Sequence, residues 1–85
     1  MILIDTNILI FAHNADSPHH KQAQQLMRDA MESKFESCIS QQNLLEFFSI
    51  ITNPKRVEKP FSSKEALSLL ENYQFSNTII KCREY

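Results

Sequence analysis

The sequence predicts an α/β domain built around a parallel sheet, and two features of the chain support this fold class. The chain opens on Met1–Ile4, an apolar run without polar alternation, which is typical of a strand that is buried on both faces. Short apolar segments then alternate with longer stretches whose apolar residues repeat at helical spacing. The order β-α-α-β-α-α-β that results favours parallel strands with helices packed across them.

Two helices are predicted between the first strand and the second. Ile8–Ala12 is expected to form a short helix, and residues 14–18 a loop in which Ser17 caps the next helix and Pro18 occupies its first turn. This next helix fades near Ser33. Its apolar residues recur at i, i+3, i+4, i+7 and i+8, which is one face of a helix. They are Ala23, Leu26, Met27, Ala30 and Met31.

The second half of the chain repeats this alternation. Ser40 is expected to cap a helix, which Asn53-Pro54 stops. Ser62 and Glu65 have the spacing of a capping box, in which each side chain bonds the backbone of the other residue. The predicted elements are a strand around 38–39, a helix over 41–52, a helix after residue 62 and a strand over 78–80.

Length and composition limit the possible functions. The chain has 85 residues, enough for one small domain or part of one. It contains no glycine, which excludes the glycine-rich loops that cradle phosphates. The net charge of −1 excludes a broad cationic surface for nucleic acid, so an RNA substrate would require positive charge from a metal ion or a partner.

Cysteine usage and the N-terminus indicate a cytoplasmic protein. Cys38 and Cys82 form no CxxC motif and are expected to be two free thiols in a reducing compartment. Asp5 interrupts the position where a signal peptide would be apolar. No apolar stretch approaches the roughly 20 residues that span a membrane, so no membrane association is expected.

Asp5 is the first candidate site residue. It directly follows the first predicted strand, and ligands of open α/β sheets bind beyond the carboxyl ends of the strands. A short carboxylate held there suits a metal ligand. The alternative is that Asp5 only caps the helix that follows it.

Glu46 is the second candidate, because it stands alone among apolar residues in Leu44–Ile51. A charge in such a stretch suggests a function. The alternative is a solvated helix face, since a polar stripe with helical spacing runs through the same segment. Its members are Gln42, Glu46, Ser49 and Asn53.

Two segments together resemble a known family. Ile4–Ile10, with its Asp-Thr-Asn opening, and the helix within Ser40–Pro54, with its embedded glutamate, are similar to PIN domains, especially the VapC-type toxins of bacterial toxin–antitoxin pairs. The resemblance implies a PIN-like three-layer fold with a central parallel sheet. It further implies hydrolysis of RNA phosphodiesters with Mg²⁺ or Mn²⁺, and a cognate antitoxin as partner. Asp5 and Glu46 match the family's acidic positions, as catalytic residues and metal ligands, with Thr6 or Asn7 supporting the first carboxylate.

The sequence departs from the PIN pattern after Glu71, where only Glu84 remains for the later acidic positions. Residues 1–85 are therefore expected to form an incomplete PIN-like domain whose C-terminal elements are missing. An open edge of the first strand then predicts a homodimer or a strand-exchanged oligomer. An inactive remnant that binds the antitoxin is the alternative function. An α/β domain unrelated to PIN, with Asp5 and Glu46 far apart, is the third hypothesis.

Other conspicuous residues have simpler interpretations. Phe47 and Phe48 have helical spacing beside other apolar residues and are expected in the core rather than stacked on bases. The basic residues of the loop 53–61 are expected to be solvated. The three histidines lack the spacing of a metal site and are expected at the surface of a loop: His13, His19 and His20.

Overall fold

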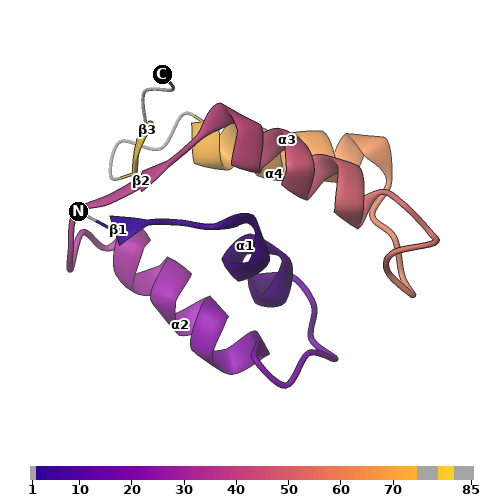
Figure 1. The fold of residues 1–85 in the computed structure, drawn as a ribbon, viewed down its shortest axis with the longest axis horizontal. Helices are drawn as coiled ribbons and strands as arrows, with labels where there is room; N and C mark the ends of the chain where they lie inside the picture. The colour runs from indigo at the N-terminus through magenta and orange to yellow at the C-terminus, as the bar shows by residue number, and fades with distance from the viewer. Residues whose placement is uncertain (1, 75–78, 82–85) are drawn as a thin grey trace.

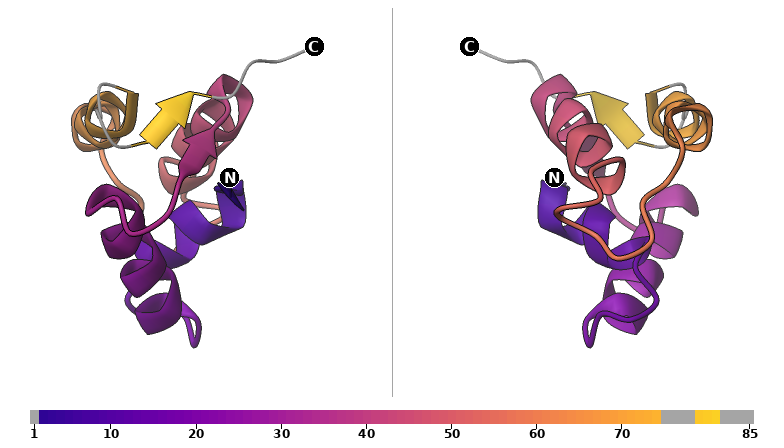
Figure 2. Two further views of the ribbon diagram at one scale, coloured as in Figure 1. Left: turned by 90° about the vertical axis from the view of Figure 1, so that its left-hand side faces the viewer. Right: turned by 90° about the vertical axis from the view of Figure 1, so that its right-hand side faces the viewer.

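A computed structural model describes residues 2–74 and 79–81, which form an α/β fold around a three-stranded parallel sheet of order β1-β2-β3 (Figure 1). Strand β3 lies between α3 on one side and α4 on the other (Figure 2). This confirms the predicted central parallel sheet with helices on both sides. The elements are β1 Ile2–Leu3, α1 Thr6–Ala12, α2 His20–Met31, β2 Ser37–Ile39, α3 Gln41–Ile51, α4 Ser63–Gln74 and β3 Ile79–Lys81.

Strand β1 differs from its prediction, because it is an edge strand and not buried on both faces. Ile2 and Leu3 are 46% and 57% exposed, and only the following residue, Ile4, is fully buried. Among the described strands, the sheet order gives β1 one neighbour, and its register pairs Leu3 with Cys38 of β2. The apolar run Ile2–Ile4 therefore marks a strand correctly but does not show how many of its sides are covered.

Helix α2 also begins later than predicted. Its N-cap is His19 rather than Ser17, because the chain first makes a turn in which the His20 N–H donates to the Ser17 carbonyl at 3.1 Å. Pro18 lies inside this turn, a position that suits its fixed φ. The Ser17 hydroxyl accepts from the His19 N–H at 3.1 Å, so it supports the turn and does not cap the helix.

Helices α3 and α4 begin as predicted. The Ser40 hydroxyl accepts from the Asn43 N–H at 3.0 Å and caps α3. Ser62 and Glu65 form the predicted capping box, with reciprocal bonds of 3.1 and 3.2 Å. Both caps satisfy backbone donors that the first turn of a helix leaves without a partner.

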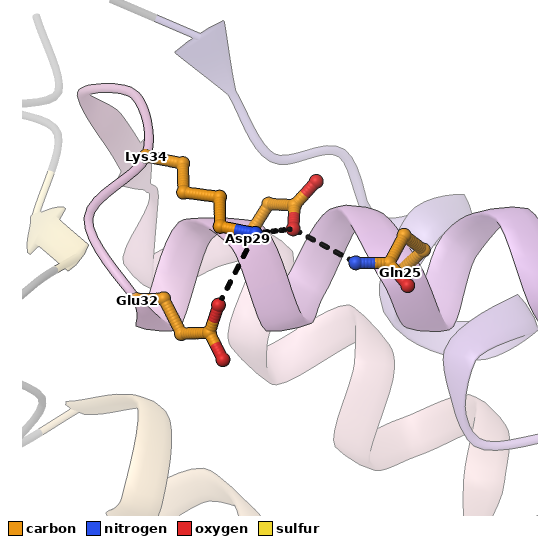
Figure 3. A network of polar contacts seen from close by, with 4 residues as sticks. All are labelled: Gln25, Asp29, Glu32 and Lys34. Carbon is orange, nitrogen blue, oxygen red and sulfur yellow. Dashed lines mark hydrogen bonds and ion pairs between the residues drawn. The ribbon is translucent and has the colours of Figure 1, made fainter.

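The turn from α2 to β2 is held by a small polar network (Figure 3). Lys34 lies 3.4 Å from carboxylate oxygens of both Asp29 and Glu32, and Gln25 donates to Asp29 at 2.8 Å. Ser33 at the tip has a φ of 60° and adopts the left-handed conformation that often ends a helix. The exposed ion pairs contribute little stability, so the network mainly orients the turn that leads into β2.

The core lies between the helices and the sheet and is built from both halves of the chain. Its largest fully buried apolar side chains are Phe47, Ile4, Leu9 and Ile39, from α3, the end of β1, α1 and β2. Phe48 is partly buried against the same cluster. Both phenylalanines of α3 are therefore packing residues, as predicted.

The described residues bear on three further expectations. Cys38 is disulfide-bonded, so the prediction of free thiols is wrong for this residue; Cys82 lies outside the described part of the chain. Thr78, predicted in the last strand, also lies outside it, while Ile79 and Ile80 are in β3 as expected. None of the helices described in 2–74 is long and apolar enough to cross a bilayer.

Candidate functional site

Asp5 lies between the end of β1 and the start of α1, and its carboxylate is exposed. Its backbone is at the N-cap position of α1, where its carbonyl accepts from the Ile8 and Leu9 N–H groups at 3.1 and 3.4 Å. The side chain makes no capping hydrogen bond. The interpretation of Asp5 as a side-chain cap is therefore not supported, and its carboxylate faces solvent at the carboxyl end of a strand.

Glu46 lies on the exposed polar stripe of α3 that the sequence predicts, but it is tied to neighbours on both carboxylate oxygens. Gln42, one turn earlier, donates to Oε1 at 3.3 Å. The Thr6 hydroxyl, from the start of α1, donates to Oε2 at 3.2 Å. Glu46 can therefore belong to a solvated helix face and still be a site residue, because its exposed carboxylate also accepts a hydrogen bond from Thr6 of another helix.

Thr6 links the two acidic positions indirectly, through the chain on one side and a hydrogen bond on the other. It directly follows Asp5, at the ~3.8 Å Cα spacing of adjacent residues, and it contacts the Glu46 carboxylate. The sequence analysis expected Thr6 or Asn7 to support the first carboxylate. For Thr6 this is wrong, because its buried hydroxyl points to α3 and contacts the second carboxylate instead.

Asn43 is a contact residue that sequence reasoning missed. Its side-chain amide donates to the Ile4 carbonyl at 3.1 Å, and its own carbonyl lies 3.4 Å from the Thr6 hydroxyl. Ile4 and Thr6 flank Asp5 on both sides. The signal in the sequence was its position three residues before Glu46, which places both residues on one face of α3.

The donor set at this site fits a hard divalent cation. Asp5 and Glu46 would supply carboxylate oxygens, and Mg²⁺ is bound in proteins through one or two carboxylates while it keeps several waters. Within 2–74 and 79–81, no group of three or more His, Cys, Asp or Glu side chains could hold a metal ion. An ion held by these residues would therefore depend on two carboxylates, water and its substrate's phosphate.

His13 is not a surface histidine, which corrects its predicted environment. Its ring packs against Phe47, Phe61 and Tyr73 with centroid distances of 5.4, 6.4 and 5.9 Å, and its Nε2 contacts the Tyr73 hydroxyl. Burial, and then the charge of His20, lower the pKa of His13 from its ordinary 6.5. A neutral His13 therefore joins the end of α1 to α4 and belongs to the packing of the fold.

A pocket of about 430 Å³ lies between the loop after α1 and the loop after α3. Arg56 and Lys59 line it, but so do Asp16 and Glu58. The mixed charge gives the pocket no clear preference for an anion. The basic residues Lys55, Arg56 and Lys59 are exposed, in agreement with the prediction that they are solvated.

Comparison with known proteins identifies the family. A protein-family model described as a PIN domain matches residues 1–83, almost the whole chain. The chain belongs to the PIN domain family. The resemblance carried by the Asp-Thr-Asn opening and the glutamate of α3 is thereby confirmed.

Two curated relatives of this PIN domain are both named Ribonuclease VapC24. They come from Mycobacterium tuberculosis strains CDC 1551 / Oshkosh and ATCC 25618 / H37Rv. Each is 28% identical over 74 residues, which cover 87% of this chain and 50% of the relative. The chain thus spans about half the length of the curated relatives it matches.

Proposed function

We propose that this PIN domain carries the first two acidic residues of a metal-dependent endoribonuclease of the VapC type. Asp5 and Glu46 are the catalytic residues and metal ligands in this proposal. Family membership supports it, as does the printed name of the relatives, Ribonuclease VapC24. The substrate is RNA, and the ion is Mg²⁺ or Mn²⁺.

The contact between Thr6 and Glu46 carries the proposal. At 3.2 Å it joins the residue next to Asp5 with the carboxylate of α3, although the two are 40 residues apart in sequence. Asp5 and Glu46 are both exposed, so a hydrated cation and an RNA phosphate could approach them from solvent. A site built only to stabilise the fold would not need two acids that face solvent.

The residues of the chain have distinct roles in this proposal. A bound divalent ion supplies an activated water and shields the negative charge of the phosphodiester. Asp5 and Glu46 orient that ion, and Thr6 limits the rotation of the Glu46 side chain. If one ion held the two carboxylates about 4 Å apart, they would repel each other by about 4 kcal/mol at an effective dielectric of 20, and the cation would offset this repulsion.

Cleavage of a fluorogenic single-stranded RNA in Mg²⁺ or Mn²⁺ tests this function. The parent chain is expected to cleave it, and chelation of the metal is expected to stop cleavage. Asp5→Asn and Glu46→Gln should each lose at least about a hundredfold in rate, since each removes a charged ligand. Glu71→Gln changes an exposed acid on α4 and should be unaffected. Cleavage that is absent, or that persists in both site variants, would contradict the proposal.

A second candidate function is a non-catalytic module that binds the cognate antitoxin. It is favoured by an apolar groove of about 260 Å³ between α1 and α2. Ile8, Phe11 and Leu26 line this groove and are only partly buried. Co-purification with the antitoxin, lost in Phe11→Ser and kept in Asp5→Asn, together with the absence of RNA cleavage, would support the binding function over the catalytic one.

Self-association of the chain is a further part of the proposal. The exposed apolar side chains of Ile2 and Leu3 lie on the edge strand β1, and open apolar edges promote strand pairing. We expect a homodimer or strand-exchanged oligomer in solution. Leu3→Lys should shift sedimentation toward the monomer, because a charge on an edge strand opposes pairing. A parent chain that sediments as a monomer would contradict this expectation.

We place the proposed activity in the cytoplasm, where RNA is available. The disulfide of Cys38 is a bond that reducing compartments disfavour. Cytoplasmic action therefore predicts that this bond is broken in cells, so that Cys38 reacts with a thiol label added at neutral pH after the extract has been quenched in acid. Complete protection of Cys38 from the label would contradict the placement.

A further inference from the structure

Asn43 makes hydrogen-bond contacts with both residues that flank Asp5. Its side-chain Nδ2 donates to the Ile4 carbonyl at 3.1 Å. Its backbone carbonyl lies 3.4 Å from the hydroxyl of Thr6. Its backbone N–H donates to Ser40, which caps α3. The first turn of α3 therefore holds the chain both before and after the first acidic residue.

This contact replaces sheet pairing at the point where β1 ends. The β1–β2 register runs from Ile2 to Leu3, and the Ile4 N–H still donates to the Cys38 carbonyl at 2.8 Å. The Ile4 carbonyl, which is the next hydrogen-bonding group along the backbone, accepts from the Asn43 side chain of α3 instead. The backbone that leads into Asp5 is thus tied to the helix that carries Glu46.

The same helix turn also restricts the second acid. Asn43 precedes Glu46 by three residues, and the Thr6 hydroxyl lies between them, 3.4 Å from the Asn43 carbonyl and 3.2 Å from Glu46 Oε2. A hydroxyl has one proton to donate, so these two acceptors share it. The separation of the two carboxylates therefore depends on how α3 sits against the end of β1.

We propose that Asn43 is a positioning residue that fixes the Asp5 backbone relative to Glu46 and so sets the geometry of their shared cation site. This inference rests on the proposed function, since it concerns the same two acids. The role proposed here for Asn43 acts through its Nδ2, which donates to the Ile4 carbonyl, and not through coordination of the cation. Residues that orient metal ligands typically change metal affinity by about 10- to 100-fold when they are replaced.

Two variants separate the hydrogen bond from simple packing. Asn43→Ala removes the amide, and Asn43→Leu removes the donor but keeps a side chain of similar size. Alanine and leucine are both better helix formers than asparagine, so neither change weakens α3 through its helix propensity. Asn53→Ala is the matched control, since it removes an asparagine whose side chain accepts from the Lys55 N–H at the other end of α3.

The test measures Mn²⁺ affinity by calorimetry and, on the metal-free chain, the NMR order parameter of the Asp5 amide. Both Asn43 variants should bind Mn²⁺ at least about tenfold more weakly than the parent. Their Asp5 order parameter should fall from about 0.85 toward 0.6, the change from rigid to flexible backbone. Melting temperatures should stay close to the parent value, and Asn53→Ala should match the parent in affinity and order.

Either of two results overturns the role of Asn43. One is parent-like Mn²⁺ affinity in both variants while Asp5→Asn loses binding, which would leave the metal site intact but independent of Asn43. The other is an unchanged Asp5 order parameter in both variants. If the parent chain binds no Mn²⁺, the metal site of the proposed function fails, and the order parameter alone decides whether Asn43 holds Asp5 in place.

Discussion

The hydroxyl of Thr6 donates to the carboxylate of Glu46 at 3.2 Å, which links the start of α1 to the middle of α3. Thr6 is buried, whereas Glu46 is exposed, so the bond joins the carboxylate of an exposed acid to a buried hydroxyl. Since Thr6 follows Asp5 directly, the same bond ties the Glu46 carboxylate to the residue beside the first acid. The predictions below follow from this contact and from the packing around it.

Replacing Thr6 by valine should weaken metal binding more than it weakens the fold. Thr6→Val keeps the branched shape but removes the donor, and Glu46 can turn to water because it is exposed. The free energy of unfolding should fall by about 1 kcal/mol or less, the net value of one hydrogen bond. Mn²⁺ affinity, measured by calorimetry, should fall by about tenfold. Thr6→Ser, which retains the hydroxyl, should restore most of that affinity.

The stability of the fold should decline in mild acid because of His13. Burial lowers the pKa of this imidazole below 6.5, so the folded state binds fewer protons than the unfolded state as the pH falls past that value. The stability present above pH 6.5 is therefore lost as the pH falls through the lower folded pKa. Melting temperatures measured from about pH 8 to about pH 5 should fall less in His13→Gln than in the parent. His19→Gln, at an exposed position, should keep the parent's slope.

Removal of the Tyr73 hydroxyl should destabilise the contact between α1 and α4. Tyr73 is buried, and burial raises its pKa to about 12, so the phenol is neutral and bonds His13 across the whole working range. Tyr73→Phe keeps the ring packing but leaves the His13 Nε2 without this partner. Urea unfolding should show a loss of about 1–2 kcal/mol. A loss of the same size in a His13→Gln background would mean that the two side chains do not interact.

The side-chain cap of α3 should contribute to the stability of the fold. Ser40→Ala removes the acceptor of the Asn43 N–H and should cost about 1 kcal/mol of unfolding free energy. Ser49→Ala on the exposed face of the same helix is the control and should cost less than about 0.5 kcal/mol. Equal losses in thermal or urea unfolding would show that the Ser40 cap contributes nothing.

Local signals in the sequence predicted most of the fold. The capping box of Ser62 and Glu65 and the cap at Ser40 are side-chain contacts three residues apart, so they can be read from spacing alone. The parallel sheet followed from apolar runs that alternate with helical periodicity. The incorrect prediction that Ser17 caps α2 shows the limit of such signals, since a turn and a helix N-terminus favour the same residue types.

Contacts between distant segments could not be predicted in this way. Leu3 has an apolar side chain, as buried strand residues usually do, yet it is exposed on the edge strand β1. His13 is at the end of a short helix in the sequence, but its environment is made by Phe47 and Tyr73 from two other helices. Asp5 and Glu46 became candidates through their positions in the sequence and the family resemblance, whereas the direction of the Thr6 hydroxyl depends on how α1 packs on α3.

Mn²⁺ binding by isothermal titration calorimetry tests the central claim most directly, namely that Asp5 and Glu46 form one cation site. The parent chain, Asp5→Asn, Glu46→Gln and the control Glu71→Gln would be titrated at the same pH and ionic strength. Saturable binding at a single site in the parent and the control, lost in both site variants, is the predicted result. No binding by the parent chain, or binding that survives either site substitution, would contradict the claim.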